Sequence, residues 1–181
     1  MRFSNGPDAF GLVSRLLHWA IAALILGLIA LGWAMVGLDY YDPWYHRAPA
    51  IHKATGMVVL GLAMIRIGWV LHSPTPGPLP ELKDFERWAA KAVHHLLAAA
   101  MVVLPVSGYL ISTSAGDGVS VYGLFTLPAL VPVSTTVRDA AIALHSYLAY
   151  GTLGLATLHA AGALKHHFVD GNDTLRRMLW K

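Results

Sequence analysis

The sequence RDAAIALHSYLAYGTLGLATLHAAGALKHHF, residues 138–168, decides the fold class. Between Asp139 and Lys165 it holds 25 residues without a formal charge. As a helix that rises about 1.5 Å per residue, this segment is about 37 Å long and can cross a hydrocarbon core about 30 Å thick. The stretch therefore predicts a membrane-spanning helix.

Two histidines lie inside this predicted span. His145 and His159 are fourteen residues apart. At about 100° per residue both side chains leave the helix on nearly the same side, about 21 Å apart along its axis. An ionisable side chain inside a span needs a polar partner and usually marks a functional site. The structural alternative, two histidines that only hydrogen-bond to neighbouring helices, is disfavoured by this shared register.

Composition places the whole chain in the membrane class. Of its 181 residues, 56% are hydrophobic and 13% are charged, whereas soluble domains average about 25% charged residues. The absence of cysteine excludes disulfides, iron–sulfur clusters and thiolate ligands, so any redox cofactor is held without bonds to sulfur. A net charge of +3 is too small to indicate a nucleic-acid partner. The first apolar run is too long for a cleavable signal, and none is expected.

We predict an all-α, integral membrane four-helix bundle that forms a single domain over residues 1–181. The spans are expected at approximately residues 16–38, 50–71, 92–115 and 140–164. The proline-rich stretch HSPTPGPLPELKDFERW, residues 72–88, predicts a stiff, solvated connection. Residues 119–137 are also uncharged, but Pro128 and Pro132 favour a loop, which dips into the membrane interface or lies above it, over a fifth span.

The distribution of lysine and arginine predicts the orientation. Four spans place both termini on one side of the membrane. That side holds ten Lys and Arg residues near the spans and the other side holds three, so both termini are expected to be cytoplasmic. The ten are Arg2, Arg15, Arg66, Lys83, Arg87, Lys91, Lys165, Arg176, Arg177 and Lys181, and the three are Arg47, Lys53 and Arg138.

This topology sorts four histidines into two pairs by depth. His18 opens the first span at the level of His159, and His52 opens the second span at the level of His145. Two pairs at two levels are what two bis-histidine haems need, with each iron held between imidazoles of facing helices. Both axial positions are then filled, which favours electron transfer over oxygen binding. A zinc site is a weaker interpretation, because zinc takes three or four ligands at one level.

Three further residues are candidates near the cytoplasmic pair. Arg66 follows His52 by fourteen residues, so it either binds a haem carboxylate at that depth or extends to the lipid headgroups. His166 lies seven residues beyond His159, and His94 opens the third span. Both histidines, with Arg66, are candidates for a quinone site that handles protons, and interfacial histidines without such a role are the alternative. No residue is singled out as catalytic.

Several motifs carry a resemblance to a known family. They are SRLLHW at 14–19, IHKATG at 51–56, HHLL at 94–97, LPVSG at 104–108, YGLFTLP at 122–128, H-x13-H-A-A-x4-H-H at 145–167 and NDTLRRM at 172–178. With these motifs, which cover nearly the whole chain, the sequence resembles the bacterial cytochrome b561 family of four-helix dihaem membrane cytochromes.

The resemblance implies two non-covalent haem b groups, ligated by His18 with His159 and by His52 with His145, in the bacterial inner membrane. Family members pass electrons between a donor and membrane quinone, and one branch is a superoxide:ubiquinone oxidoreductase. We expect that activity here, with superoxide guided by the three outer basic residues and with ubiquinone as acceptor. The alternatives are a cytochrome b anchor subunit of a hydrogenase or other periplasmic dehydrogenase, and a haem-handling membrane protein without redox cycling. A protein partner is possible but not required.

Overall fold

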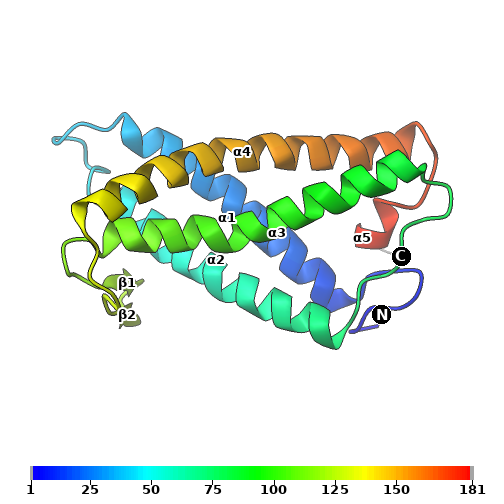
Figure 1. Cartoon of the computed structure of the whole chain (residues 1–181), viewed down its shortest axis with the longest axis horizontal. Coiled ribbons are helices and arrows are strands. Elements are labelled where there is room, and N and C mark those ends of the chain that lie inside the picture. The colour runs from blue at the N-terminus through cyan, green and yellow to red at the C-terminus, as the bar shows by residue number, and fades with distance from the viewer. Residues whose placement is uncertain (1, 180–181) are drawn as a thin grey trace.

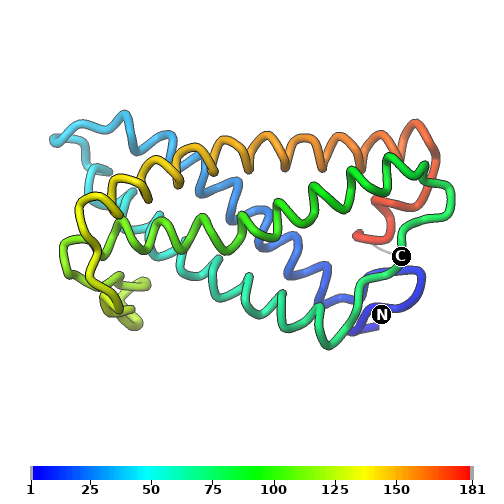
Figure 2. The backbone as a smooth tube through the Cα atoms, viewed as in Figure 1, coloured from blue at the N-terminus to red at the C-terminus, as the bar shows by residue number. Residues whose placement is uncertain are grey.

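Four long helices form the molecule, and the computed structural model describes residues 2–179 (Figure 1). They are α1 (Leu12–Val36), α2 (Arg47–His72), α3 (Asp84–Ser112) and α4 (Thr135–Phe168), and each is long and apolar enough to cross a membrane. Neighbours in sequence pack side by side, and α4 returns to α1 with a sparser contact. Both chain ends lie at one end of the bundle, here called the terminal end (Figure 2).

Local hydrogen bonds explain where α3 and α4 begin. The Glu86 carboxylate accepts the Lys83 N–H at 3.1 Å, so α3 begins at Asp84, inside the connection expected to be irregular. The Ser134 Oγ accepts the Val137 N–H at 3.3 Å and caps α4. These caps extend the helices beyond the apolar spans expected from hydropathy.

A short hairpin follows α3, where the sequence predicts a loop. Strands β1 (Val119–Val121) and β2 (Phe125–Leu127) pair antiparallel. The two valines of β1 are buried against Met57 of α2, and Tyr109 of α3 packs beside them. The Tyr109 hydroxyl donates to the Pro128 carbonyl at 2.6 Å. The segment thus covers the end of the bundle opposite the termini, here called the hairpin end, and forms no spanning helix.

The chain termini are joined at the terminal end. The short helix α5 (Arg176–Leu179) folds back under the bundle. Arg177 is only 7% exposed, and its guanidinium donates to the carbonyls of Asp8 at 2.6 Å and Gly77 at 3.0 Å. This side chain therefore ties the C-terminal tail to the N-terminal segment and to the α2–α3 connection. Lys181, one of the ten basic residues counted above, lies outside the described residues.

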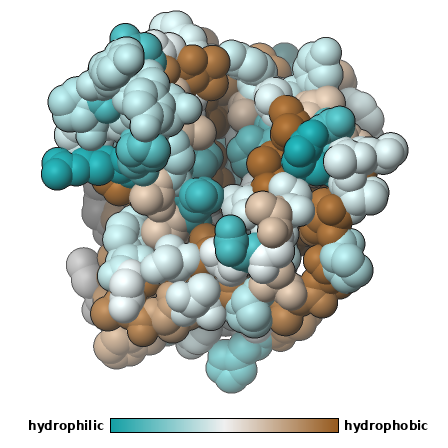
Figure 3. Space-filling model, turned by 90° about the vertical axis from the view of Figure 1, so that its left-hand side faces the viewer, coloured by the Kyte–Doolittle hydropathy of each residue, from teal (hydrophilic) through white to brown (hydrophobic). Residues whose placement is uncertain are grey.

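Small side chains allow α2 and α3 to approach closely. Ala54 and Ala63 of α2 and Ala100 of α3 are at most 2% exposed, as is common where membrane helices meet. Within the most apolar 18-residue stretch of each long helix, at most 22% of the residues are buried. Most of these apolar side chains therefore lie on the outward faces of the bundle. Figure 3 views the hairpin end, where hydrophilic residues are spread across the face and strongly hydrophobic residues gather around its edge.

Candidate functional site

The hairpin end brings the rings of His52 and His145 close together across the bundle. His52 comes from α2 and His145 from α4, and both are half-buried. Their ring centroids lie 6.1 Å apart with planes at 65°. The sequence-predicted partners therefore lie together at this end, and we call them the hairpin-end pair.

A glycine of a neighbouring helix lies against each ring of this pair. A Cβ added at Gly32 of α1 would lie 3.2 Å from Cε1 of His52. A Cβ at Gly108 of α3 would lie 3.2 Å from Cε1 of His145. Contacts of this length are tighter than ordinary packing, so both positions favour a residue without a side chain. A glycine therefore makes room for the imidazole ring on each side of the pair.

The terminal end brings together His18 of α1 and His159 of α4, here called the terminal-end pair. Their ring centroids lie 6.0 Å apart with planes at 62°. His94 of α3 lies closer still, with its ring centroid 4.9 Å from that of His159. Arg66 of α2 lies within electrostatic range of all three histidines. Within residues 2–179 its guanidinium makes no hydrogen bond or ion pair.

The spacing of the rings tests whether these residues fit a bis-histidine metal site. Ligand nitrogens lie about 2 Å from the metal, and a ring centre lies about 1 Å further, so opposed imidazoles have centroids about 6 Å apart. The two pairs, at 6.0 and 6.1 Å, match this distance. His94 and His159, at 4.9 Å, do not. The histidines thus fit two axially ligated haems, and the spacing favours His18 over His94 as the partner of His159.

The quinone candidates are separated by the structure. His94 joins the terminal-end pair, whereas the His166 side chain, which is 12% exposed, has its Nδ1 2.6 Å from the Asp170 carboxylate. Lys165 Nζ lies 2.6 Å from Glu86 and 2.8 Å from Asp170. Hydrogen bonds from Lys165, and next from His166, hold the pKa of Asp170 below its ordinary value of 3.8. Because an ammonium group joins the two carboxylates, we interpret this cluster as a link between α3 and α4, not as a metal site.

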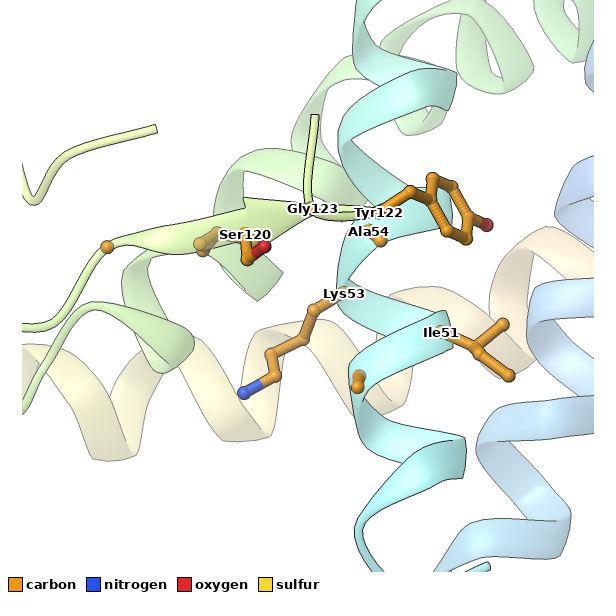
Figure 4. A pocket seen from close by; sticks show the side chains of 9 residues that line it. Ile51, Lys53, Ala54, Ser120, Tyr122 and Gly123 are labelled. Atoms are coloured by element: carbon orange, nitrogen blue, oxygen red, sulfur yellow. The ribbon is translucent and has the colours of Figure 1, made fainter. Parts of the chain in front are cut away.

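The outer basic residues occupy different surroundings. Arg138 is paired with its neighbour Asp139 at 2.8 Å. Lys53 lines a cavity of about 370 Å³ between α2 and the hairpin (Figure 4). In that view Tyr122 reaches from the hairpin turn across α2, and Lys53 points the other way. The Tyr122 hydroxyl contacts the Thr55 hydroxyl, which holds the hairpin on α2.

The cavity lies on the side of α2 away from the hairpin-end pair. Ala50 and Ala54, which line it, are each two residues from His52, and two steps of about 100° place them on the opposite face of the helix. Lys53, which lines the same cavity, therefore does not contact the pair. Arg47, the first residue of α2, makes no ion pair with any residue that the structure describes.

Sequence reasoning missed the residues that hold the rings. Ser107 Oγ lies 3.0 Å from Nδ1 of His145, and Gly108 follows it in the motif LPVSG. The fourteen-residue spacing identifies which face of a helix the histidines share. It does not show which residue of a neighbouring helix each ring meets, because this depends on helix rotation and packing.

Four apolar helices that hold two stacked histidine pairs with metal-ligand spacing are the arrangement typical of membrane-embedded b-type cytochromes. Over residues 9–181 the sequence matches the family described as "Prokaryotic cytochrome b561", and the chain belongs to this family. Membership implies haem b and a role in electron transport.

Three relatives cover nearly the whole chain. "Cytochrome b561 homolog 2" of Escherichia coli (strain K12) is 44% identical over 100% of this chain and 96% of its own length. "Probable superoxide oxidase CybB" of Yersinia pestis is 30% identical over 91% of this chain and 92% of its own length. "Cytochrome b561 homolog 1" of Escherichia coli (strain K12) is 25% identical over 90% and 92%.

Proposed function

We propose that this protein is a single-domain dihaem cytochrome that carries electrons across the bacterial inner membrane. One observation carries the proposal: two histidine pairs, spaced 6.1 and 6.0 Å, at two levels of one bundle. Family membership implies haem b, and the spacing supports one haem at each pair. The fourteen-residue step along α4 from His145 to His159 corresponds to about 21 Å, which is most of the hydrocarbon core.

The four paired histidines would be the axial ligands. His52 and His145 would hold haem b at the hairpin end, and His18 and His159 would hold it at the terminal end. When bound, the group would supply a reversible one-electron centre. The chain's own helices orient the imidazoles and exclude water from them.

Both termini are cytoplasmic in this proposal, so the hairpin end faces outward. The support is the charge distribution: nine of the ten basic residues counted for the cytoplasmic side lie among the described residues, and the outer side has only three. The shared location of the termini at one end of the bundle agrees with an even number of spans.

Superoxide is the proposed donor at the hairpin end. The support is that the Yersinia pestis relative is named as a probable superoxide oxidase, together with the charges of Arg47 and Lys53, which attract a small anion. Arg138 contributes less, because Asp139 neutralises it. Two superoxide anions each lose one electron and leave as dioxygen. One quinone takes up these two electrons and two protons and leaves as quinol.

Ubiquinone is the proposed acceptor at the terminal end. Arg66 offers a positive charge that no residue of the described part of the chain pairs with, beside the terminal-end pair, and this charge would stabilise the oxygen of a quinone as it gains electrons. His94, next to His159, is the candidate proton donor. His166 is a more distant candidate, because Asp170 holds it in the surface cluster.

The first test is a haem count on the purified protein. A visible spectrum with a pyridine-haem assay is expected to give two haem b per chain, and the variants His145→Ala and His18→Ala are expected to give one each. A count of one or none in the unmodified protein would refute the proposal.

The second test is stopped-flow spectroscopy. A pulse of superoxide is expected to reduce the protein, and ubiquinone-1 is expected to reoxidise it. Fast reduction by superoxide with no transfer to quinone would contradict the acceptor. If superoxide does not reduce the protein, and a co-purifying dehydrogenase does reduce the haems, the protein is instead an anchor subunit of that dehydrogenase. Haems that resist all redox titration would indicate a protein that handles haem without electron transfer.

A further inference from the structure

Only one of the four paired histidines has hydrogen-bond partners at its Nδ1 within residues 2–179. Nδ1 of His145 lies 3.0 Å from Ser107 Oγ and 3.1 Å from the Leu104 carbonyl oxygen. Ser107 is 2% exposed and Leu104 is 9% exposed, so water does not compete for these contacts. Both partners belong to α3, one turn apart.

Hydrogen accounting assigns the tautomer of this ring. The Leu104 carbonyl can only accept, so the hydrogen of the contact lies on Nδ1 of His145. The single hydrogen of the Ser107 hydroxyl is donated to the same carbonyl at 2.8 Å, so Ser107 Oγ also accepts from Nδ1 of His145. The Nδ1–H is shared between two acceptors, and Nε2 is left with a free lone pair for a metal.

The opposite ring of the pair has no such support. Nδ1 of His52 is buried and has no hydrogen-bond partner among the described residues. The carbonyl of Leu28 on α1 gives this ring a weaker polar contact, outside normal hydrogen-bond geometry. Gly32 and Gly108 flank the two rings in the same way, so the difference between the rings is confined to the polar contacts at Nδ1.

Hydrogen bonding at Nδ1 changes what a ligating imidazole does to its metal. An acceptor for the Nδ1–H fixes the ring orientation and makes the other nitrogen a stronger donor. A stronger donor stabilises the oxidised metal ion and lowers its reduction potential. Within residues 2–179, His145 is the one paired histidine whose Nδ1 meets acceptors at normal hydrogen-bond geometry, so this effect is strongest at the hairpin-end pair.

We propose that Ser107 is a positioning residue that, with the Leu104 carbonyl, orients His145 and makes the hairpin-end site the lower-potential site of the two. This inference rests on the proposed function, because it requires a haem at each pair. A lower potential at the hairpin end makes electron flow from an outer donor toward the terminal end favourable. Ser107 thus contributes to the direction of transfer without contacting a substrate.

The test is a potentiometric titration of the purified, haem-loaded protein followed by visible spectroscopy. Two midpoints are expected. Ser107→Ala is expected to raise the lower midpoint and leave the higher one unchanged, because only the hairpin-end site loses an acceptor. Ser107→Thr keeps the hydroxyl and is expected to retain the original midpoint. Ser112→Ala is the matched control, because Ser112 donates only to the Gly108 carbonyl of its own helix.

Each outcome decides the inference. Two haems with both midpoints unchanged in Ser107→Ala, or a shift of the higher midpoint alone, would overturn the role of Ser107 and leave the proposed function intact. If Ser107→Ala loses haem, the variants Ser107→Val and Ser107→Thr replace it, because their side chains have the same shape and only threonine carries a hydroxyl. Equal midpoints in these two variants would also overturn the role of Ser107. A protein without two haems fails the haem count first and refutes the proposed function itself.

Discussion

At the scale of single residues, Gly108 gives His145 the space for its ring. Substitution by alanine would place a Cβ 3.2 Å from Cε1 of His145, so either the ring or α3 must shift. We expect Gly108→Ala to lower the free energy of unfolding by about 1–3 kcal/mol and to reduce the haem count at the hairpin end. Thermal unfolding in detergent and a pyridine-haem assay measure both effects.

Gly154 of α4 supplies the control, because no atom lies within 4 Å of a Cβ built there. Gly154→Ala is expected to retain both haems and to be as stable as the unmodified protein or more so, since alanine favours a helix over glycine. Equal haem content in the two variants would show that the space beside His145 is not required.

Arg66 is expected to act on quinone and not on haem retention. Arg66→Gln removes a positive charge that has no partner among the described residues. A hydrogen bond to a charged group contributes about 1.5–3 kcal/mol, so reoxidation by ubiquinone-1 should slow at least about tenfold while reduction by superoxide is unchanged. Arg87→Gln is the control at the same end of the bundle, because Arg87 already donates to the Pro80 carbonyl. Loss of haem in Arg66→Gln would indicate a role in cofactor binding instead.

The residues of the candidate site were predictable to different degrees. The pairing of His18 with His159 and of His52 with His145 follows from depth in the membrane, and the structure places each pair together. Ser107 was not predictable, because its role depends on the rotation of α3 relative to α4. A serine within an apolar helix is often satisfied by its own backbone.

At the scale of elements, the cluster formed by Glu86, Lys165, His166 and Asp170 joins the first turn of α3 to the last turn of α4. The Lys165 and His166 hydrogen bonds depress the pKa of Asp170. A depressed carboxyl pKa adds stability above the ordinary value of 3.8 that is lost as pH falls through the folded-state value. We therefore expect the midpoint of thermal unfolding to fall more steeply in the unmodified protein than in Asp170→Asn as the pH falls from about 5 through the ordinary value of 3.8 and below it.

Comparing how the unfolding midpoint depends on pH in the two proteins separates the contribution of Asp170 from that of the other carboxylates. Asp170→Asn removes the titrating group and keeps the side-chain shape, so both proteins should approach the same unfolding midpoint at the acidic limit. Parallel curves over the whole range would mean that the contact seen between Lys165 and Asp170 does not stabilise the fold.

The elements themselves were predictable where apolar length decides them. Long apolar runs identify all four long helices, since few other structures satisfy backbone groups in lipid. The start of α3 at Asp84 was not predicted, because proline density suggested an irregular connection and the Glu86 cap acts locally. The hairpin was interpreted as a loop because its strands have three residues each. They are too short for an alternating pattern and depend on packing against Met57.

At the scale of the whole molecule, the order of helix packing explains why the pairs meet inside the bundle. Each helix packs on its neighbour in sequence, and α4 closes the ring on α1. Side chains on the inner faces of α2 and α4 can then meet across the interior, as His52 and His145 do. The two levels of histidines consequently share one interior.

Orientation in the membrane gives the last prediction. Because the chain has no cysteine, a single introduced thiol reports on one position only. Tyr41→Cys lies in the α1–α2 connection, where the native side chain is 91% exposed, and Asn172→Cys lies in the tail beyond α4. If the basic residues set the topology, a membrane-impermeant maleimide should label the first variant in intact cells and the second only after the cells are broken open. Labelling of Asn172→Cys in intact cells would invert the topology, place the terminal-end pair at the outer face, and exchange the proposed donor and acceptor ends.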